Sequence, residues 1–318
     1  MLAVTMGDAN GVGPEIVLRS AAAGALGDDV TVYGDGAALE LAAGKLGLDR
    51  ELPAGVCMVD LALLGIDDVR PGEVDARVGA AAVDYVEVAT RAALAGEAEA
   101  IVTLPVNKEA CRASRPGFTG HTEFIAGLCD TPSVTMMLAS DRLIVTHVST
   151  HVSLAEAIDR ARTERILDVV RLTNDAVRLL RPSARIAVAG LNPHAGEHGA
   201  FGTEEEDEIR PAIERAREEG IDAYGPEPGD TVFHNAVHRN RFDAVVCMYH
   251  DQGHIPMKTL DFDGGVNVTL GLPIVRTSVD HGTAYDIAYQ GRARTRSFEL
   301  ALEMARRLTA GRAEETTA

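Results

Sequence analysis

The chain has 318 residues, 46% of them hydrophobic, and a formal net charge of −18 at pH 7. This length exceeds the usual size of a single hydrophobic core, so we expect two domains or one large α/β unit. Because the summed negative field repels nucleic acid and anionic membranes, we predict neither as a partner. Any anionic substrate must therefore be held by local cations.

The N-terminus and the cysteines indicate the compartment. An acidic residue, Asp8, comes too early for a signal peptide, and no apolar run approaches the ~18 residues of a membrane span. The four cysteines form no Cys-x-x-Cys pair, which is typical of reduced, packed thiols. We expect a cytoplasmic protein.

The first predicted loop follows an apolar strand at residues 2–6. It covers residues 7–15 (GDANGVGPE) and leads into an amphipathic helix. A Gly-rich turn between a strand and a helix can bind a phosphate on the helix amides. However, Ile16 stands where the dinucleotide-binding fingerprint has its third glycine. A phosphate site and a plain tight turn both remain open for this loop.

Strands and helices alternate along the rest of the chain. Apolar, β-branched runs predict strands, and apolar spacings of three and four predict helices. The predicted strands cover residues 31–33, 100–104, 143–152, 185–190, 242–248 and 274–277. The predicted helices cover residues 37–48, 80–95, 153–180, 203–220 and 297–308, before a frayed tail at 309–318. This order indicates a largely parallel sheet covered by helices.

Three histidines, His151, His194 and His250, stand at the carboxyl ends of predicted strands. Ligands of open α/β sheets bind beyond these strand ends, so the three imidazoles can converge although they are far apart in sequence. Neutral imidazole binds divalent metals, and we therefore predict a metal site of these three residues. The other candidates lack this placement and are interpreted as packing or surface residues: His147, His198, His234, His238 and His254.

The stretch 249–258 (YHDQGHIPMK) carries two imidazoles, a carboxylate, a carboxamide and an ammonium within ten residues. Asp251 is a candidate proton acceptor, with support of a neighbouring metal ligand as the alternative role. Lys258 suits a phosphate or another anion. Taken alone, the stretch is also compatible with a surface turn that carries polar side chains.

Four motifs follow one another along the chain: GHTE at 120–123, NPHAGE at 192–197, YHDQGH at 249–254 and RTSVDHGTA at 276–284. Together they resemble the 4-hydroxythreonine-4-phosphate dehydrogenase (PdxA) family, and the similarity extends from Thr5 to about Ala288. The resemblance implies two α/β/α domains similar to the isocitrate and isopropylmalate dehydrogenase fold, with the active-site cleft between them. We predict a discontinuous cofactor-side domain of residues 1–120 plus 270–318, and a metal and dimer domain of residues 121–269. The resemblance also implies a homodimer with its sites at the subunit interface.

The resemblance assigns roles to individual residues. It matches His151, His194 and His250 to the family's metal ligands, the same set that the strand ends select. Three imidazoles favour zinc, with magnesium or cobalt as alternatives. The residues matched to substrate binding are His121, Thr122, Lys258, Asn267 and Arg276, and we take Asp251 and Lys258 as catalytic candidates. The loop matched to the NAD side contributes His281, Gly282, Thr283, Ala284 and Asp286.

The implied activity is NAD-dependent oxidation and β-decarboxylation of a small 4-phosphorylated hydroxy acid. We expect 4-(phosphooxy)-L-threonine as the substrate, giving 3-amino-2-oxopropyl phosphate and CO2 in pyridoxal phosphate biosynthesis. D-erythronate or D-threonate 4-phosphate is the alternative, and the loop at 7–15 departs from the family's usual GDPAGIGPE. A non-catalytic metal or phosphometabolite binding protein, or a three-histidine hydrolase, would not need Arg276 or the loop at 281–286.

Overall fold

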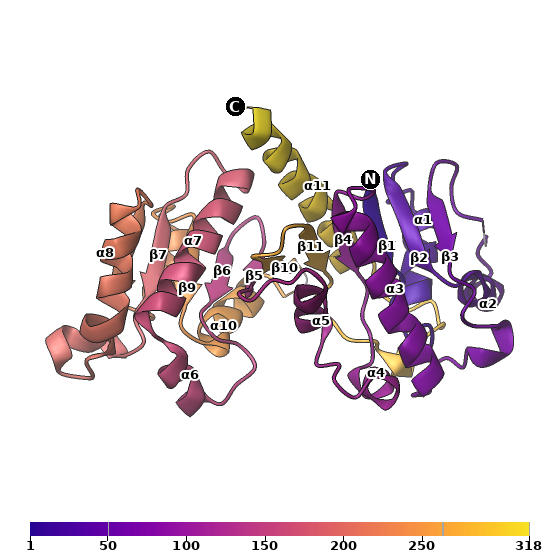
Figure 1. Cartoon of the computed structure of the whole chain (residues 1–318), viewed down its shortest axis with the longest axis horizontal. Coiled ribbons are helices and arrows are strands. Elements are labelled where there is room, and N and C mark those ends of the chain that lie inside the picture. The colour runs from indigo at the N-terminus through magenta and orange to yellow at the C-terminus, as the bar shows by residue number, and fades with distance from the viewer. Residues whose placement is uncertain (50, 263, 318) are drawn as a thin grey trace. The chain divides into compact units, whose positions relative to one another are not determined.

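The chain folds into two α/β units in this computed structural model, which describes residues 1–49, 51–262 and 264–317 (Figure 1). Unit 1 comprises Met1–Val134 and Leu272–Thr309, and unit 2 comprises Thr135–Gly271 and the chain from Ala310 onward. The α/β class agrees with the sequence analysis. The first boundary lies at Val134 rather than residue 120, because Ile125 and Ala126 pack into the core of unit 1.

Unit 1 is built on a parallel sheet with the strand order β3-β2-β1-β4-β11. In register, Leu2 of the central strand lies opposite Val30 on one side and Ala100 on the other. Helices cover both faces, and every residue of β1, β2, β4 and β11 is buried. The strands are β1 (Leu2–Thr5), β2 (Val30–Gly34), β3 (Cys57–Asp60), β4 (Ala100–Thr103) and β11 (Val275–Ser278). The helices are α1 (Gly13–Ala22), α2 (Gly36–Leu46), α3 (Ala76–Leu94), α4 (Lys108–Ser114), α5 (His121–Leu128) and α11 (Arg296–Thr317), with short 3₁₀ turns η1 (Ile66–Asp68) and η4 (Tyr285–Ile287).

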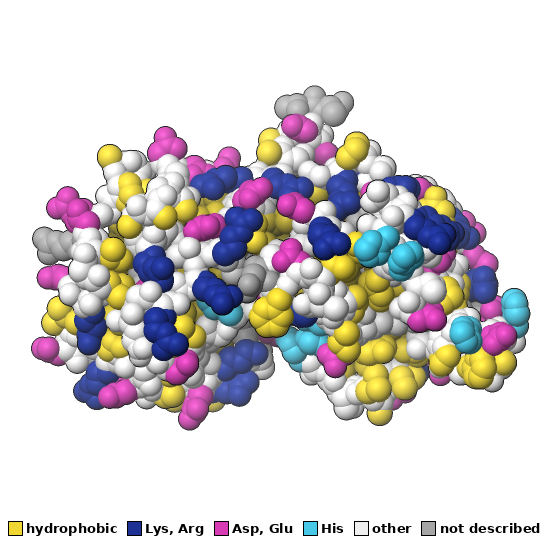
Figure 2. All heavy atoms as spheres, turned by 180° about the vertical axis from the view of Figure 1, so that it is seen from behind, with side chains coloured by type: hydrophobic (Ala, Val, Ile, Leu, Met, Phe, Trp, Pro, Cys, Tyr) yellow, Lys and Arg dark blue, Asp and Glu magenta, His cyan; other side chains and the backbone are white. Residues whose placement is uncertain are grey.

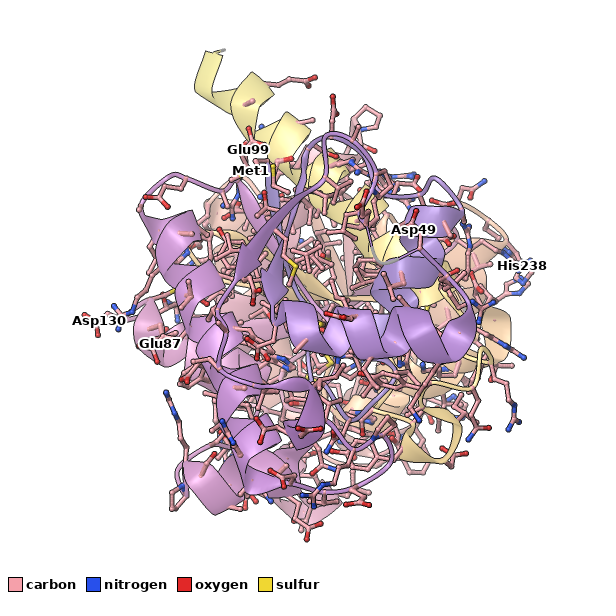
Figure 3. All side chains as sticks on the ribbon, turned by 90° about the vertical axis from the view of Figure 1, so that its right-hand side faces the viewer. Met1, Asp49, Glu87, Glu99, Asp130 and His238 are labelled. Carbon is pink, nitrogen blue, oxygen red and sulfur yellow. The ribbon has the colours of Figure 1, made fainter. Side chains whose placement is uncertain are left out.

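Local sequence signals explain several ends of these elements. The Asp75 carboxylate caps α3 by accepting from the backbone N–H groups of Arg77 and Val78, at 2.7 and 3.2 Å. At the start of β1, the N-terminal ammonium of Met1 donates to Glu99 Oε2 at 2.5 Å, and both residues lie together in Figure 3. This contact aligns the first strand with the segment that leads into β4.

Unit 2 is built on a mixed sheet with the strand order β10-β5-β6-β9-β7-β8. β5 pairs antiparallel with both β10 and β6, whereas β6, β9, β7 and β8 run parallel. The strands are β5 (Thr135–Ala139), β6 (Ile144–His147), β7 (Ile186–Ala189), β8 (Ala223–Glu227), β9 (Ala244–Cys247) and β10 (Val266–Leu270). The helices are α6 (Leu154–Arg160), α7 (Thr163–Leu180), α8 (Arg210–Glu218), α9 (Val232–Val237) and α10 (His250–Leu260), with a 3₁₀ segment η2 (Pro193–Gly199) and a π-helical turn η3 (Glu205–Ile209).

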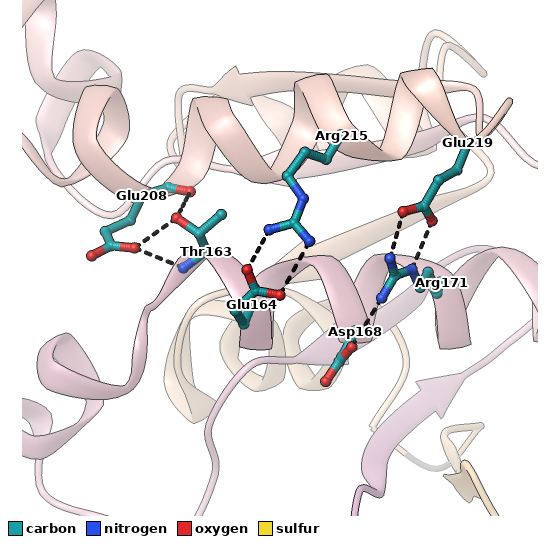
Figure 4. Close-up of polar contacts among 7 residues, drawn as sticks. All are labelled: Thr163, Glu164, Asp168, Arg171, Glu208, Arg215 and Glu219. Atoms are coloured by element: carbon teal, nitrogen blue, oxygen red, sulfur yellow. Dashed lines mark hydrogen bonds and ion pairs between the residues drawn. The ribbon is translucent and has the colours of Figure 1, made fainter.

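Polar contacts join α7 to the segment η3–α8 along one side of unit 2 (Figure 4). Glu208 Oε2 accepts from both the backbone N–H and the hydroxyl of Thr163 at 2.7 Å, which fixes the start of α7. Further along, Arg215 pairs with Glu164, and Arg171 Nε donates to Glu219 Oε2 at 2.7 Å. These surface pairs each contribute little, but together they set the register of the two helices.

The structure corrects several predicted ends. The strand predicted at 143–152 ends at His147, so His151 lies in the following loop rather than on a strand face. The helix predicted at 153–180 is divided into α6 and α7. The tail predicted to fray from 309 is helical to Thr317, because Gly311 packs closely against Leu179; residue 318 lies outside the described part.

Two observations concern the surface. In the ranges that the structure describes, no helix is long and apolar enough to cross a membrane. On the face shown in Figure 2, acidic and basic side chains are interspersed with apolar ones.

Candidate active site

The three strands that precede His151, His194 and His250 are neighbours in unit 2, in the order β6-β9-β7. The loop after β6 follows the end of β9, since Val148 N–H donates to Cys247 O at 2.8 Å and Ser149 Oγ donates to Met248 O at 3.0 Å. The sheet therefore brings the three loops to one edge, as the strand-end argument predicts.

His151 and His250 come together within one chain. Their ring centroids lie 5.9 Å apart. His250 begins α10, and its Nδ1 lies 2.7 Å from Asp251 Oδ1. With the carboxylate as acceptor, this contact fits the imidazole tautomer that has its proton on Nδ1 and a lone pair on Nε2 for a metal. Asp251 is thus placed to orient His250, the second of the two roles predicted for it.

His194 lies on the turn after β7 and lines a pocket of about 660 Å³ with Tyr249, Asp251 and Gln252. Its ring is 6.2 Å from that of Phe201, between centroids. The His194 turn and the start of α10 therefore line the same pocket. Its apolar wall includes Ile255 of α10.

The structure brings two of the three predicted metal ligands, His151 and His250, close to each other. Within residues 1–49, 51–262 and 264–317, no three His, Cys, Asp or Glu side chains gather closely enough to hold a metal ion. Two imidazoles, those of His151 and His250, have the donor type and proximity that a divalent metal requires.

Two histidines that the sequence analysis set aside lie against this pair. The His254 ring stacks on that of His250, with centroids 3.6 Å apart and planes inclined by 10°. His254 Nδ1 lies 3.2 Å from Nε2 of His147, which is completely buried. Burial, aided by neighbouring imidazoles, lowers the pKa of His147 to about 3 and that of His254 to about 4. Both rings are therefore neutral at physiological pH.

The sequence carries a signal for the contacts of His254 with His250 and His147. His254 follows His250 by four residues, which places both on one face of α10. Gly253 lets the helix approach β6, because a Cβ there would lie 2.6 Å from His147 Nε2. The four-residue spacing of His250 and His254, together with Gly253 between them, predicts that His254 lies beside His250 and near β6.

Three of the five substrate-binding candidates belong to unit 1. His121 and Thr122 begin α5, and Arg276 lies in β11 with an exposed fraction of 3%. Arg276 Nη2 donates to Thr103 Oγ1 at 2.7 Å, and burial lowers the pKa of Arg276 to about 10, so the guanidinium stays charged. His121 Nε2 is buried without a hydrogen-bond partner. Burial first, then the charges of Arg276 and Lys108, lower the pKa of His121 to about 3.

This arrangement identifies one residue that the sequence analysis missed. Lys108 begins α4, and its Nζ lies 3.5 Å from the position that a Cβ on Gly120 would occupy. Unit 1 thus collects two cations and a neutral imidazole beside the carboxylate of Glu123, whose Oε2 lies 3.0 Å from the same Gly120 position.

The other two substrate-binding candidates belong to unit 2. Lys258 lies in the last turn of α10, with Nζ 5.1 Å from the centre of the Phe262 ring. Asn267 lies in β10, and its Oδ1 is buried without a hydrogen-bond partner. A buried acceptor left without a donor is unusual in a folded protein and is consistent with a ligand site.

The candidate cofactor loop packs on the N-terminal loop in unit 1. Thr283 O accepts from Val12 N–H at 3.0 Å, and the Tyr285 hydroxyl donates to Asp8 Oδ2 at 2.8 Å. Ala284 has a positive φ of 43°, whereas the side chains of His281 and Asp286 are exposed. Gly282 supplies the carbonyl 2.9 Å from His281 Nδ1.

The N-terminal loop itself is a tight turn. Every residue from Gly7 to Gly13 is buried. A Cβ on Gly13 would lie 2.0 Å from Met6 O, so the glycine is required by packing. The structure thus favours the tight turn over a phosphate seat at this loop.

The chain is similar to known proteins over nearly its whole length. Residues 28–305 match the family described as pyridoxal phosphate biosynthetic protein PdxA. The chain is 45% identical to a 4-hydroxythreonine-4-phosphate dehydrogenase of Geobacter metallireducens, covering 96% of this chain and 94% of the relative. It is 42% identical to a D-threonate 4-phosphate dehydrogenase of Pectobacterium atrosepticum, covering 97% and 99%.

A solved structure agrees with the sequence comparison. The crystal structure of 4-hydroxythreonine-4-phosphate dehydrogenase from Klebsiella pneumoniae superimposes with a TM-score of 0.88 at 41% identity, covering 97% of this chain and 99% of that one. Both the sequence and the fold are therefore shared over nearly the full length. The chain belongs to the PdxA family, and the relatives compared here are named as dehydrogenases.

Proposed function

We propose that the protein is a cytoplasmic, NAD-dependent and metal-requiring dehydrogenase that oxidises and decarboxylates a 4-phosphorylated hydroxy acid. The proposed substrate is 4-(phosphooxy)-L-threonine, and the products are 3-amino-2-oxopropyl phosphate and CO2. The observation that carries the proposal is the His151–His250 imidazole pair at one sheet edge, in a chain that matches named dehydrogenases over almost its whole length.

A divalent metal fits the residues at this edge. His151 and His250 would hold it, the latter through Nε2, and imidazole ligands favour zinc over magnesium or cobalt. Such an ion would act as a Lewis acid on the substrate's hydroxyl and carboxylate oxygens. Asp251 keeps His250 in the required tautomer by accepting from Nδ1 at 2.7 Å.

The remaining residues would bind the substrate's anionic groups and NAD. Arg276 suits bidentate contact with a carboxylate or phosphate, and the buried His121 Nε2 needs a hydrogen-bond partner that a ligand can supply. Lys258 and Asn267 would contribute a charge and an acceptor from unit 2. NAD would lie along the loop at 281–286, where exposed side chains rest on a buried scaffold.

We further propose a homodimer in which the third metal ligand is His194 of the partner subunit. Two observations support it. Among the residues that the structure describes, His151 and His250 of one chain lie together without a third candidate ligand, and large apolar side chains are exposed near them. Leu154 on α6 is 60% exposed, and on and after α10 Ile255 and Phe262 are 62% and 71% exposed. Exposed apolar surface beside a site is typical of an interface.

One assay distinguishes this proposal from its rivals. The purified protein is stripped with a chelator, supplied with zinc, magnesium or cobalt, and mixed with NAD and one candidate phosphate at a time. NADH formation with 4-(phosphooxy)-L-threonine supports the proposal. Faster formation with D-threonate or D-erythronate 4-phosphate would favour the sugar-acid alternative, for which the Pectobacterium relative speaks. Phosphate release without NADH would indicate a hydrolase, and tight binding without turnover a non-catalytic binding protein.

A further inference from the structure

The turn that carries His194 has a backbone that ordinary residues avoid. Six consecutive residues, 194–199, have positive φ, and four of them are not glycine: His194, Ala195, Glu197 and His198. His194 itself has φ 55° and ψ 29°. In L-residues this left-handed conformation pushes Cβ against a carbonyl oxygen, so a run of four such residues persists only where neighbouring groups hold it.

One buried carboxylate, that of Glu205, accepts three hydrogen bonds at the entrance of this turn. Glu205 is 1% exposed, and its Oε1 accepts from the backbone N–H groups of Leu191 and Asn192, at 2.7 and 2.6 Å. Its Oε2 accepts from Asn192 Nδ2 at 3.0 Å. A Cβ added to Gly196 would lie 2.7 Å from Glu205 Oε2, so the carboxylate occupies the inner side of the turn.

Glu205 is itself rigidly placed. It begins the π-helical turn Glu205–Ile209, a wider turn than an α-helix and one that often occurs at functional sites. Three residues later Glu208 binds both the N–H and the hydroxyl of Thr163, which anchors this turn to α7 (Figure 4). The anchor of the His194 turn is therefore part of the helical framework of unit 2.

A second side chain joins this turn to the start of α10. Gln252 Nε2 donates to Gly190 O at 2.7 Å, and its Oε1 accepts from Met248 N–H at 2.6 Å. Gly190 directly follows β7 and Met248 directly follows β9, so Gln252 connects the two strand exits that lead to His194 and His250.

We infer that Glu205 is a positioning residue: it holds the left-handed turn and thereby fixes His194, while Gln252 couples this turn to α10. The inference rests on the proposed function in one respect, that His194 is a metal ligand. The hydrogen bonds that Glu205 accepts from the turn do not depend on that assignment and can be tested separately.

The test compares Glu205→Ala, Glu205→Gln and the control Glu206→Gln. Glu206 lies on the same π-helical turn, but it pairs with Arg210 at 2.8 Å on the surface. In metal-free protein without NAD, amide hydrogen exchange at Leu191 and Asn192 should accelerate at least ~10-fold in Glu205→Ala, because both N–H groups lose their acceptor. Glu205→Gln keeps one acceptor oxygen and should lie between wild type and Glu205→Ala. Glu206→Gln should match wild type.

The second readout is zinc affinity, measured by competition with a chromogenic chelator. We expect Glu205→Ala to weaken zinc binding at least ~10-fold while the far-ultraviolet circular dichroism spectrum remains that of wild type, with partial recovery of zinc affinity in Glu205→Gln. Unchanged exchange at Leu191 and Asn192 in Glu205→Ala would overturn the inference whatever the protein's function. Faster exchange with unchanged zinc affinity, in a protein where His194→Ala does weaken zinc, would also overturn it, since the turn would not fix His194. If His194→Ala leaves zinc affinity unchanged as well, it is the proposed function that fails.

Discussion

Two loops that follow parallel strands, residues 7–13 after β1 and residues 193–199 after β7, are built in opposite ways. In the first, glycines stand where no side chain fits: a Cβ on Gly7 would lie 2.4 Å from Pro105 O, and one on Gly13 would lie 2.0 Å from Met6 O. In the second, four residues other than glycine adopt positive φ. A Gly-rich loop here indicates close packing, whereas left-handed conformations in ordinary residues indicate a loop shaped for a function.

The largest effect should come from Gly13→Ala in the first loop. The added Cβ would meet the carbonyl of Met6, a backbone atom that cannot move without disturbing β1. We expect a loss of about 3 kcal/mol or more in the free energy of unfolding, measured by urea titration, or no soluble protein.

The matched control is Gly44→Ala in α2, where an added Cβ has no atom within 4 Å. Because glycine in an exposed helix interior is unfavourable, this substitution should stabilise the protein by about 0.5–1 kcal/mol. Equal stability of the two variants would show that the first loop is not closely packed.

In the second loop, His194→Ala should leave the fold intact and remove function. The proposed site would lose one of its three ligands, so tight metal binding and NADH formation should both be lost. His198→Ala is the control, since His198 lies on the same exposed turn with φ 55° and has no assigned role. Metal analysis of both purified variants decides, and full occupancy with normal turnover in His194→Ala would remove this residue from the site.

Mixing inactive variants tests where the third ligand comes from. If His151 and His250 of one chain bind the metal together with the partner subunit's His194, a heterodimer of His194→Ala and His250→Ala keeps one intact site. Activity should then return to about a quarter of wild type after random subunit exchange, because half of the dimers are mixed and each has one good site. A mixture of His151→Ala and His250→Ala should stay inactive, since both residues come from the same chain. Activity at background in the first mixture, with exchange shown by mass, would assign the site to a single subunit.

Much of the framework and the three histidines follow from sequence, because strand–helix alternation and strand ends are local signals. The difference in backbone conformation between the two loops does not follow from the sequence. The motif at 192–197 has one glycine and gives no sign of left-handed backbone, which depends on Glu205 from a later segment. The sequence predicts an ordinary helix over residues 203–220, whereas Glu205–Ile209 form a π-helical turn. Likewise, the contact of His147 with His254 depends on the packing of α10 against β6.

The smallest effect is expected for Ala195→Gly, which tests directly whether the left-handed backbone of the second loop is strained. Ala195 has φ 51° and ψ 47°, where an L-residue costs roughly 1–2 kcal/mol relative to the right-handed region and glycine does not. Glycine also gains about 0.5–1 kcal/mol of conformational freedom in the unfolded chain relative to alanine. The two effects oppose each other, so the free energy of unfolding should stay unchanged or rise by up to about 1 kcal/mol.

Ala310→Gly, at an exposed position inside α11, makes the same chemical change without the strain and should lose about 0.5–1 kcal/mol. Urea unfolding of both variants in metal-free protein measures the difference, which should favour Ala195→Gly by about 1 kcal/mol or more. If Ala195→Gly loses as much as Ala310→Gly, the turn stores no strain at this residue. Ala195 would then adopt the left-handed conformation without measurable strain. The two loops would differ only in how closely their glycines are packed.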